Sequence, residues 1–236
     1  MPQLSFKDKT IAITGASGTL GRSLLSAFHA EGTRLIALSS SETEIKAEGV
    51  PENAIQTVVW KIGQESELDA LWAEVDILVL NHGINVHGDR SPEALQKSYE
   101  INTFSHWHLL NHFLAVNADP QRAANKEVWV NTSEAEVGPA LSPLYELSKR
   151  TIGDWVTLRR LDSPCILRKL ILGPFRSALN PIGVMQPDHI AQQIIVQAQR
   201  DVRNIIVTIN PLTWIFFPLR EALVSQYFQW FTTPNV

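Results

Sequence analysis

Short runs of apolar residues recur along the chain, and amphipathic stretches separate them. The first run, TIAIT at residues 10–14, is rich in β-branched residues and has polar neighbours on both sides, which is typical of a buried strand. Runs of the same kind predict further strands at residues 34–39, 55–60, 75–81, 127–133, 165–172 and 204–209.

Helical spacing of apolar residues appears between these runs. The stretch at residues 20–32 has this spacing and ends at a glycine. Further helices are predicted near residues 66–73, 92–117, 143–160 and 188–200. Alternation of strand and helix indicates a parallel sheet with right-handed crossovers and helices on both faces. We therefore predict one doubly wound α/β domain in three layers over residues 1–210.

A hydrophobic tail, residues 211–236, follows this domain. Its helical stretch is mostly apolar, and only Glu221, Ser225 and Gln229 form a narrow polar stripe. So much apolar surface needs a cover, which is either the protein itself or a membrane interface that suits aromatic residues. Arg220 is the only basic residue, so lipid binding would depend on apolar burial. We expect a tail that packs on protein and also makes peripheral contact with a membrane.

Composition narrows the function class. The 236 residues carry a net charge of -4 and no run of lysine or arginine, so we expect no nucleic-acid partner. A single cysteine, Cys165, excludes an internal disulfide and suits a reducing compartment. The first residues, MPQLSFKDKT, do not resemble a signal peptide. We expect a cytoplasmic protein, with membrane association open through the tail.

A glycine-rich loop, TGASGTLG, stands between the first strand and the first helix. Gly15, Gly18 and Gly21 let the backbone turn sharply and let a pyrophosphate approach the helix N-terminus, where the helix dipole favours negative charge. The spacing alone is equally compatible with a tight structural turn. The position after a strand and before a helix favours a nucleotide site.

Four more motifs follow in order: the Asn-His-Gly triplet at residues 81–83, then Asn102, Ser133 and a Tyr-x-x-x-Lys pair, Tyr145 and Lys149. Together with the glycine loop they resemble the short-chain dehydrogenase/reductase family, whose domain is a Rossmann-type sheet. The resemblance extends over nearly the whole predicted domain. It implies an enzyme that moves a hydride between a nicotinamide cofactor and a carbonyl or alcohol.

The resemblance also implies roles for the four catalytic candidates. Tyr145 is the acid and base, and Lys149, about 6 Å away along one helix face, lowers the pKa of Tyr145 and binds the nicotinamide ribose. Ser133 orients the substrate oxygen, and Asn102 holds a water that connects Lys149 to solvent. The cofactor contacts implied are Gly15, Ser17, Gly18, Leu20, Gly21, Ser39, Ser40, Asn81, Gly83, Tyr145, Lys149, Gly173 and Pro174.

Four features depart from the family pattern. Gly18 stands one position earlier than in most members of this size, a pattern more typical of the longer, extended branch of the family. His82 replaces an alanine, Lys61 stands where an aspartate usually meets the adenine ring, and Gly173-Pro174 inverts the usual Pro-Gly order. The last change affects the shape of the nicotinamide and substrate mouth.

The cofactor is predicted from the end of the second strand. An acidic residue there would bind the ribose 2′-hydroxyl of NAD and repel a 2′-phosphate, but this chain has Ser39, Ser40 and Ser41. The three hydroxyls favour NADP, with NAD as the alternative.

The predicted function is an NAD(P)-dependent oxidoreductase that interconverts a carbonyl and an alcohol. Its substrate is expected to be a small lipophilic molecule, because the segment from Gly173 to about Asp188 should line the substrate mouth and is apolar. The apolar residues are Phe175, Leu179, Ile182, Val184 and Met185. The alternative is a non-catalytic nucleotide-binding protein with the same fold, either a redox sensor or an assembly factor.

Other polar residues are expected to have no role in the chemistry. Glu134 and Glu136 flank Ser133 and are interpreted as solvated loop charges, and His108 and His112 as a helix surface, so no metal site is predicted. The family resemblance implies a homodimer or homotetramer that pairs through the helices of Asn102 and Tyr145. Their candidate contact residues are Trp107, Leu110, Phe113, Ile152, Trp155 and Leu158.

Overall fold

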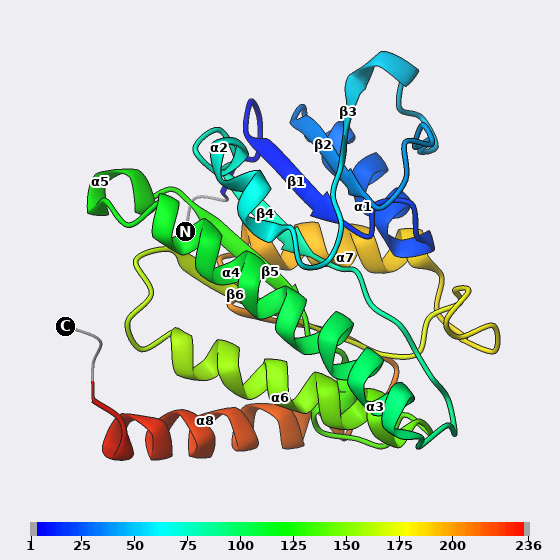
Figure 1. Ribbon diagram of the computed structural model, residues 1–236, viewed down its shortest axis with the longest axis vertical. Helices are drawn as coiled ribbons and strands as arrows, with labels where there is room; N and C mark the ends of the chain where they lie inside the picture. Colours follow the sequence, from blue (N-terminus) through cyan, green and yellow to red (C-terminus); the bar gives the residue numbers. More distant parts are fainter. Residues whose placement is uncertain (1–3, 234–236) are drawn as a thin grey trace.

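The computed structural model describes residues 4–233 and confirms the predicted doubly wound α/β fold (Figure 1). Seven parallel strands form one sheet in the order β3-β2-β1-β4-β5-β6-β7. They are β1 (Thr10–Thr14), β2 (Arg34–Ser39), β3 (Ile55–Val59), β4 (Ile77–Leu80), β5 (Glu127–Asn131), β6 (Ile166–Leu172) and β7 (Asn204–Val207). The strand order reverses between β1 and β4, and such a reversal opens a crevice at the carboxyl ends of the strands.

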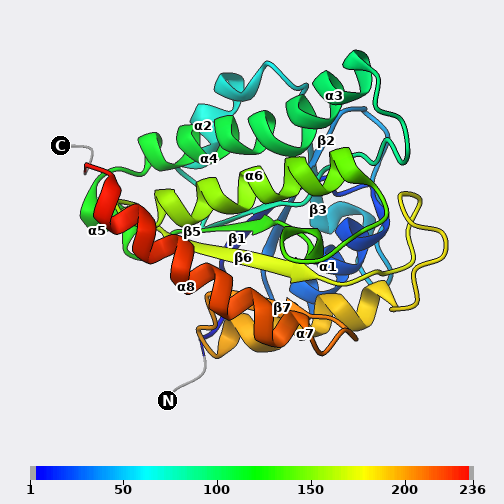
Figure 2. The ribbon, with the colours of Figure 1, turned by 90° about the horizontal axis from the view of Figure 1, so that it is seen from below.

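Helices cover both faces of this sheet (Figure 2). On one face, α1 (Thr19–Ala30) packs beside α7 (Pro187–Gln199). The other face carries α2 (Asp69–Trp72), α4 (Ser105–Val116) and α6 (Pro143–Arg159). Two further helices on this side are α3 (Pro92–Tyr99), which leads into α4, and the single turn α5 (Pro120–Ala123).

Alternation along the buried strands divides the core into two apolar layers. In β1, Ile11 and Ile13 pack with the helices α1 and α7, whereas Ala12 between them packs in the layer under α4 and α6. Both layers are fully enclosed, as expected for a parallel sheet covered on two faces. The apolar runs that predicted strands in the sequence therefore form the buried strands of the sheet.

The boundaries of some predicted elements differ from the structure. The predicted helix at residues 92–117 is interrupted by a π-helical turn, Glu100–Phe104, between α3 and α4. The stretch at residues 66–73 forms a 3₁₀ turn, Glu65–Leu68, followed by the single turn of α2. Apolar periodicity does not distinguish these tighter or wider turns from a regular helix.

Two charged residues lie in the middle of β6. Arg168 and Lys169 have no exposed surface, and charges buried in this way require partners. The Nε of Arg168 lies 2.8 Å from Glu127 Oε2 on the neighbouring strand. The Nζ of Lys169 lies 2.7 Å from the carboxylates of both Glu136 and Glu221. These ion pairs join β6 to the loop after β5 and to the C-terminal helix.

The predicted tail forms the helix α8 (Thr213–Phe231), which lies along α6 on the outside of the molecule (Figures 1 and 2). Its buried side chains are Thr213, Phe217 and Glu221, spaced four residues apart on one face. Phe217 packs on Ile171 of β6 and Ile206 of β7. The helix therefore packs on the protein through a narrow stripe that includes its acidic residue.

The remaining surface of α8 is apolar and exposed. Its large exposed side chains, with the residue before the helix, are Leu212, Trp214, Ile215, Phe216, Leu219, Leu223, Tyr227, Trp230 and Phe231. Nevertheless, no helix among residues 4–233 is long and apolar enough to cross a bilayer. We refer to this set of residues below as the apolar face of α8.

Candidate active site

The candidate site lies at the carboxyl ends of the central strands. Thr14 ends β1, Asn81 follows β4, Ser133 follows β5 and Gly173 follows β6. In a parallel sheet these ends meet at one edge, so strand register alone brings distant motifs together. The sequence motifs therefore converge at one site.

The glycine loop bends tightly before α1. Gly15 has a φ of +63°, and a Cβ there would lie 2.8 Å from the Cα of His82, so only glycine fits. A Cβ on Gly21 would collide with the Gly15 carbonyl oxygen. Gly18 caps α1 with no side-chain hydrogen bond, which leaves the amide groups of the first turn for an anion. In the same loop Ser17 is exposed and Leu20 is buried in the core.

His82, the residue that replaces the family alanine, connects the glycine loop to α4. One ring nitrogen, Nδ1, lies 2.8 Å from the Thr14 hydroxyl, and Nε2 lies 3.2 Å from the Ser105 hydroxyl. Ser105 in turn donates to Glu65, which accepts the backbone N–H of Gly63. A chain of hydrogen bonds thus runs from β1 to the loop after β3.

Two imidazoles are in contact here. The ring centroids of His82 and His106 lie 4.1 Å apart, and Nε2 of His106 donates to the backbone carbonyl of His82 at 2.9 Å. Burial lowers the pKa of His82 to about 3, and Lys149 adds a smaller effect in the same direction. Burial also lowers the pKa of His106 well below its usual value. Both rings are therefore neutral at physiological pH.

Asn102 lies inside the π-helical turn with no exposed surface. Its side chain pairs with the backbone of Ile84: Oδ1 accepts from the Ile84 N–H at 2.9 Å, and Nδ2 donates to the Ile84 carbonyl at 3.0 Å. Nδ2 also reaches the hydroxyl of Ser148 at 3.1 Å. The side-chain amide of Asn102 therefore fixes the loop after β4.

Gly83 packs between Asn102 and Lys149. A Cβ there would lie 3.0 Å from Asn102 Oδ1 and 3.8 Å from the Nζ of Lys149. Asn81, the first residue of the triplet, accepts a hydrogen bond from the Asn131 side chain at 3.1 Å. The Asn-His-Gly triplet thus lies against both helices that carry catalytic candidates.

Ser133 has an unusual backbone conformation. Its φ of 68° and ψ of 156° lie in a region used almost only by glycine, and a residue held there costs about 1–3 kcal/mol. Its hydroxyl accepts from the Ala135 N–H at 3.3 Å, and it also interacts with the Tyr145 phenol, an interaction that lowers the pKa of Tyr145. Strain of this kind persists only where the surroundings hold the residue in place.

Lys149 and Tyr145 lie on one face of α6, as the spacing predicted. The Nζ of Lys149 is 5.8 Å from the Tyr145 ring centroid and donates to the Asn131 carbonyl at 2.8 Å. Burial lowers the pKa of Lys149 from 10.5 to about 7. Burial also raises the pKa of Tyr145, and the hydrogen bond with Ser133 opposes this. The direction for Tyr145 differs from the lowering that we expected, because both groups are buried and Lys149 loses part of its charge near neutral pH.

The remaining cofactor candidates surround this edge. Ser39 is buried, and its hydroxyl accepts the N–H of Ser41, whereas Ser40 is exposed. Gly173 is packed so closely that a Cβ would lie 2.9 Å from the Glu134 carboxylate. The carbonyl of Pro174 accepts the N–H groups of residues 184 and 185 and closes the loop after β6.

The interpretation of Glu134 and Glu136 as solvated loop charges is wrong. Glu136 is 1% exposed and pairs with Lys169, and burial raises the pKa of Glu136. Glu134 accepts three side-chain hydrogen bonds from the segment that leads into α8. A signal for this was present: two basic residues inside the apolar run at 165–172 require acidic partners elsewhere in the chain.

Residues 9–161 match the family model described as short chain dehydrogenase. The chain belongs to the short-chain dehydrogenase family. A monoglucosyldiacylglycerol epimerase from Synechocystis sp. is 55% identical over 230 residues, which make up 97% of this chain and 56% of that protein. The chain therefore spans little more than half the length of this relative.

Two solved structures share the fold. An alcohol dehydrogenase from the archaeon Thermococcus sibiricus, complexed with 5-hydroxy-NADP, is 20% identical with a TM-score of 0.70 over 86% of this chain and 96% of that one. A short chain dehydrogenase from Burkholderia cenocepacia, in complex with NADP, is 15% identical with a TM-score of 0.72 over 98% and 100%. At this identity the likeness concerns the fold.

Replacing His82 by alanine should make stability less sensitive to acid. The pKa of His82 is about 3 in the folded protein against 6.5 ordinarily, so below pH 6.5 the unfolded chain binds a proton that the folded chain does not. Wild-type stability should fall as the pH drops, and the variant should lose about 2 kcal/mol less between neutral pH and about pH 5. Urea unfolding at the two pH values measures the loss of unfolding free energy for each protein. The cavity that the substitution leaves lowers the stability of the variant equally at both pH values, so it cancels in this loss. The exposed His108→Ala is the control, and equal acid losses in wild type and His82→Ala would contradict a buried neutral ring.

Proposed function

We propose that this chain is an NADP-dependent oxidoreductase that acts on the sugar headgroup of a membrane glycolipid. The observation that carries the proposal is the joining of Ser133, Tyr145 and Lys149 at the strand ends, beside a glycine loop that fits a dinucleotide. The Synechocystis relative, named an epimerase of monoglucosyldiacylglycerol, supports the substrate class and an inversion of configuration.

Inversion at a carbinol carbon fits the chemistry of this site. When bound, the nicotinamide would take a hydride from the carbon and return it to the opposite face, so no net oxidation results. Tyr145 would accept the hydroxyl proton as the carbonyl forms and give it back as the alcohol is restored. Ser133 would hold the substrate oxygen through its hydroxyl. Tyr145 must be a tyrosinate before it accepts this proton, and the positive charge of the buried Lys149 would stabilise that anion.

The residues present fit a bound dinucleotide. The first turn of α1 has free amide groups for the pyrophosphate, and Gly15 and Gly21, where a Cβ would collide with the protein backbone, allow the tight loop that leads into this turn. At the end of β2 the exposed Ser40 offers a hydroxyl and no carboxylate, which supports NADP over NAD. Lys149 would bind the nicotinamide ribose.

The apolar face of α8 supports contact with a lipid surface. The charged residues of this helix are Arg220 and Glu221, and both are used inward: Arg220 pairs with Asp154, and Glu221 with Arg160 and Lys169. The helix is therefore polar towards the protein and apolar towards the outside, the reverse of a solvated helix. A bilayer interface is the surface that accepts tryptophan, tyrosine and phenylalanine together.

This apolar surface continues towards the predicted substrate mouth. A pocket of about 410 Å³ is lined by Trp214 from α8 and by Val184 and Met185 from the loop after β6. Ile209, which also lines this pocket, is largely exposed. A lipid that enters along α8 would therefore meet these apolar side chains, and its polar headgroup would meet the polar residues that also line the pocket, Gln186, His189, Gln193, Gln197 and Thr208.

We also propose a homodimer or homotetramer formed through α4 and α6. Of the predicted contact residues, Leu110, Phe113 and Ile152 are buried in the chain's own core. Trp107 and Trp155 remain partly exposed and stack 5.1 Å apart. They are the anchors that a partner subunit would cover.

Tyr145→Phe should reduce turnover at least a thousandfold, because it removes the proton donor and almost no volume. NADP affinity and melting temperature should stay close to wild type. Lys149→Ala should lower both turnover and NADP affinity. The assay follows conversion of monoglucosyldiacylglycerol in phospholipid vesicles with NADP, and binding is measured by calorimetry. A Tyr145→Phe protein with more than a small fraction of wild-type turnover would contradict the catalytic assignment.

A carboxylate at Ser40 should change the cofactor preference. Ser40→Asp places a negative charge at an exposed position where a 2′-phosphate would bind, so NADP affinity should fall about tenfold while NAD affinity is equal or higher. Ser39→Asp is the poorer test, since Ser39 is buried and a charge there would disturb folding. Ser40→Asn is the neutral control. An unchanged ratio of the two affinities would place the 2′ position elsewhere.

Charges on the apolar face of α8 should abolish vesicle binding. Leu223 and Trp230 are 61% and 70% exposed, so glutamate at either position leaves the fold intact. Co-sedimentation with uncharged phospholipid vesicles should fall about tenfold or more for each variant and should vary little with salt. Gln226→Glu adds the same charge at a polar position of the helix and should have a smaller effect. If the variants instead dissociate an oligomer in light scattering and wild type does not bind vesicles, α8 is a subunit interface.

A further inference from the structure

The strained conformation of Ser133 raises the question of what maintains it. Its N–H donates to the Leu170 carbonyl at 3.2 Å, and its carbonyl accepts the Glu136 N–H at 3.2 Å. These two bonds fix the chain before and after the residue. They do not fix the residue that follows, Glu134. The orientation of Glu134 is set by its own contacts.

Glu134 is held by an unusually complete set of contacts. Its carboxylate accepts from Thr208 Oγ1, Asn210 Nδ2 and Thr213 Oγ1, each at 2.6 Å. Its backbone carbonyl accepts the N–H groups of Val137 and Gly138 at 3.0 Å. Hydrogen bonds to an ionised acceptor are short and strong, so both the side chain and the main chain of Glu134 are immobilised.

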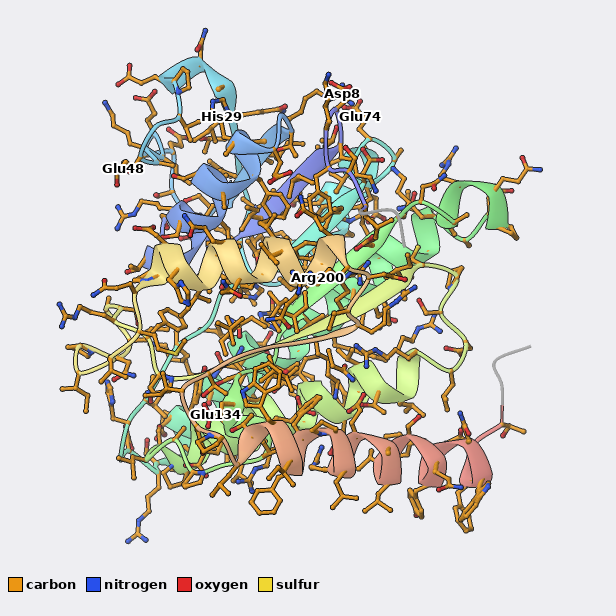
Figure 3. The ribbon with its side chains drawn as sticks, turned by 180° about the vertical axis from the view of Figure 1, so that it is seen from behind. Asp8, His29, Glu48, Glu74, Glu134 and Arg200 are labelled. Atoms are coloured by element: carbon orange, nitrogen blue, oxygen red, sulfur yellow. The ribbon has the colours of Figure 1, made fainter. Side chains whose placement is uncertain are left out.

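All three side-chain donors come from the segment that connects β7 to α8. Thr213 is the first residue of α8 and is buried, and Figure 3 shows Glu134 where the chain enters this helix. Gly173, directly after β6, also lies against the carboxylate, and a Cβ there would lie 2.9 Å from Oε2. The carboxylate is thus enclosed between β6 and the start of α8.

We infer that Glu134 is a positioning residue that holds Ser133 against Tyr145 and links that contact to the first turn of α8. The inference rests on the proposed function only in assigning Ser133 to the substrate oxygen. A shift of α8 would move Thr213, and through Glu134 it would move the neighbouring Ser133. The seating of the exposed helix and the geometry of the site are therefore coupled.

The test is a double-mutant cycle that needs no substrate. The protein has three tyrosines, so NMR of isotope-labelled tyrosine rings, assigned with Tyr145→Phe, reports the Tyr145 environment directly. Ser133→Ala should shift the Tyr145 resonance because the hydrogen bond is lost. Glu134→Ala should shift it in the same direction, and the double variant should match Ser133→Ala alone, since residues that act through one contact are not additive.

Three further variants separate positioning from general stability. Glu134→Gln keeps the size and an acceptor oxygen and should restore most of the wild-type signal. Thr213→Val removes one donor from α8 and should give a smaller shift in the same direction as Glu134→Ala. Val128→Ala in β5 lowers the melting temperature without touching the loop and should leave the Tyr145 resonance unchanged.

Turnover on vesicles of monoglucosyldiacylglycerol with NADP is the second readout. Glu134→Ala should lower kcat about ten- to a hundredfold, as misplacement of a catalytic group does, with NADP affinity unchanged. A Tyr145 resonance that moves with Ser133→Ala but stays in place with Glu134→Ala would overturn the inference. A full shift in the cycle, with no turnover by wild type, would support the positioning role and contradict the proposed substrate instead.

Discussion

A lysine ammonium with no exposed surface must be neutralised inside the protein, and Lys169 is such a group in the middle of β6. Its two carboxylate partners come from separate parts of the chain: Glu136 from the loop that follows Ser133, and Glu221 from α8. One buried charge therefore fixes the active-site loop and the C-terminal helix to the same strand. Gly153 of α6 belongs to this arrangement, because a Cβ there would collide with the Glu136 carboxylate.

The same constraint explains the inverted polarity of α8. Glu221 must face Lys169 and Arg160, and Arg220 must face Asp154, so the charged side of the helix points inward. The 3.6-residue period then places the aromatic and aliphatic residues outward. An apolar exposed face is thus a consequence of how the helix is attached. A chain that keeps such a face exposed needs a lipid or protein surface to cover it.

The fold was predictable because it depends on local patterns. Buried parallel strands read as apolar runs, as TIAIT does, and the glycine loop marks a turn that no other residue type fits. The pairing of Tyr145 and Lys149 followed from helix spacing, whereas Ser133 was placed beside them by the family resemblance. The roles of Glu134 and Glu136 were missed because their partners lie 33 to 84 residues away in sequence. The strain at Ser133 and the pKa directions of Tyr145 and Lys149 depend on burial, which no local pattern encodes.

The proposed glycolipid substrate would require the site to lie near the membrane surface, and the attachment of α8 is consistent with this. An interfacial helix lies in the plane of the membrane with its apolar face about 5–10 Å into the boundary between headgroups and acyl chains, so both of its ends stand near headgroup level. Thr213, the first residue of α8, is hydrogen-bonded at 2.6 Å to Glu134, which is adjacent to Ser133 in the chain. In the proposed membrane-bound state Ser133, the candidate for holding the substrate oxygen, would therefore lie near the lipid headgroups. A sugar could then reach the site while its acyl chains stay in the bilayer, so the lipid need not leave the membrane for the reaction.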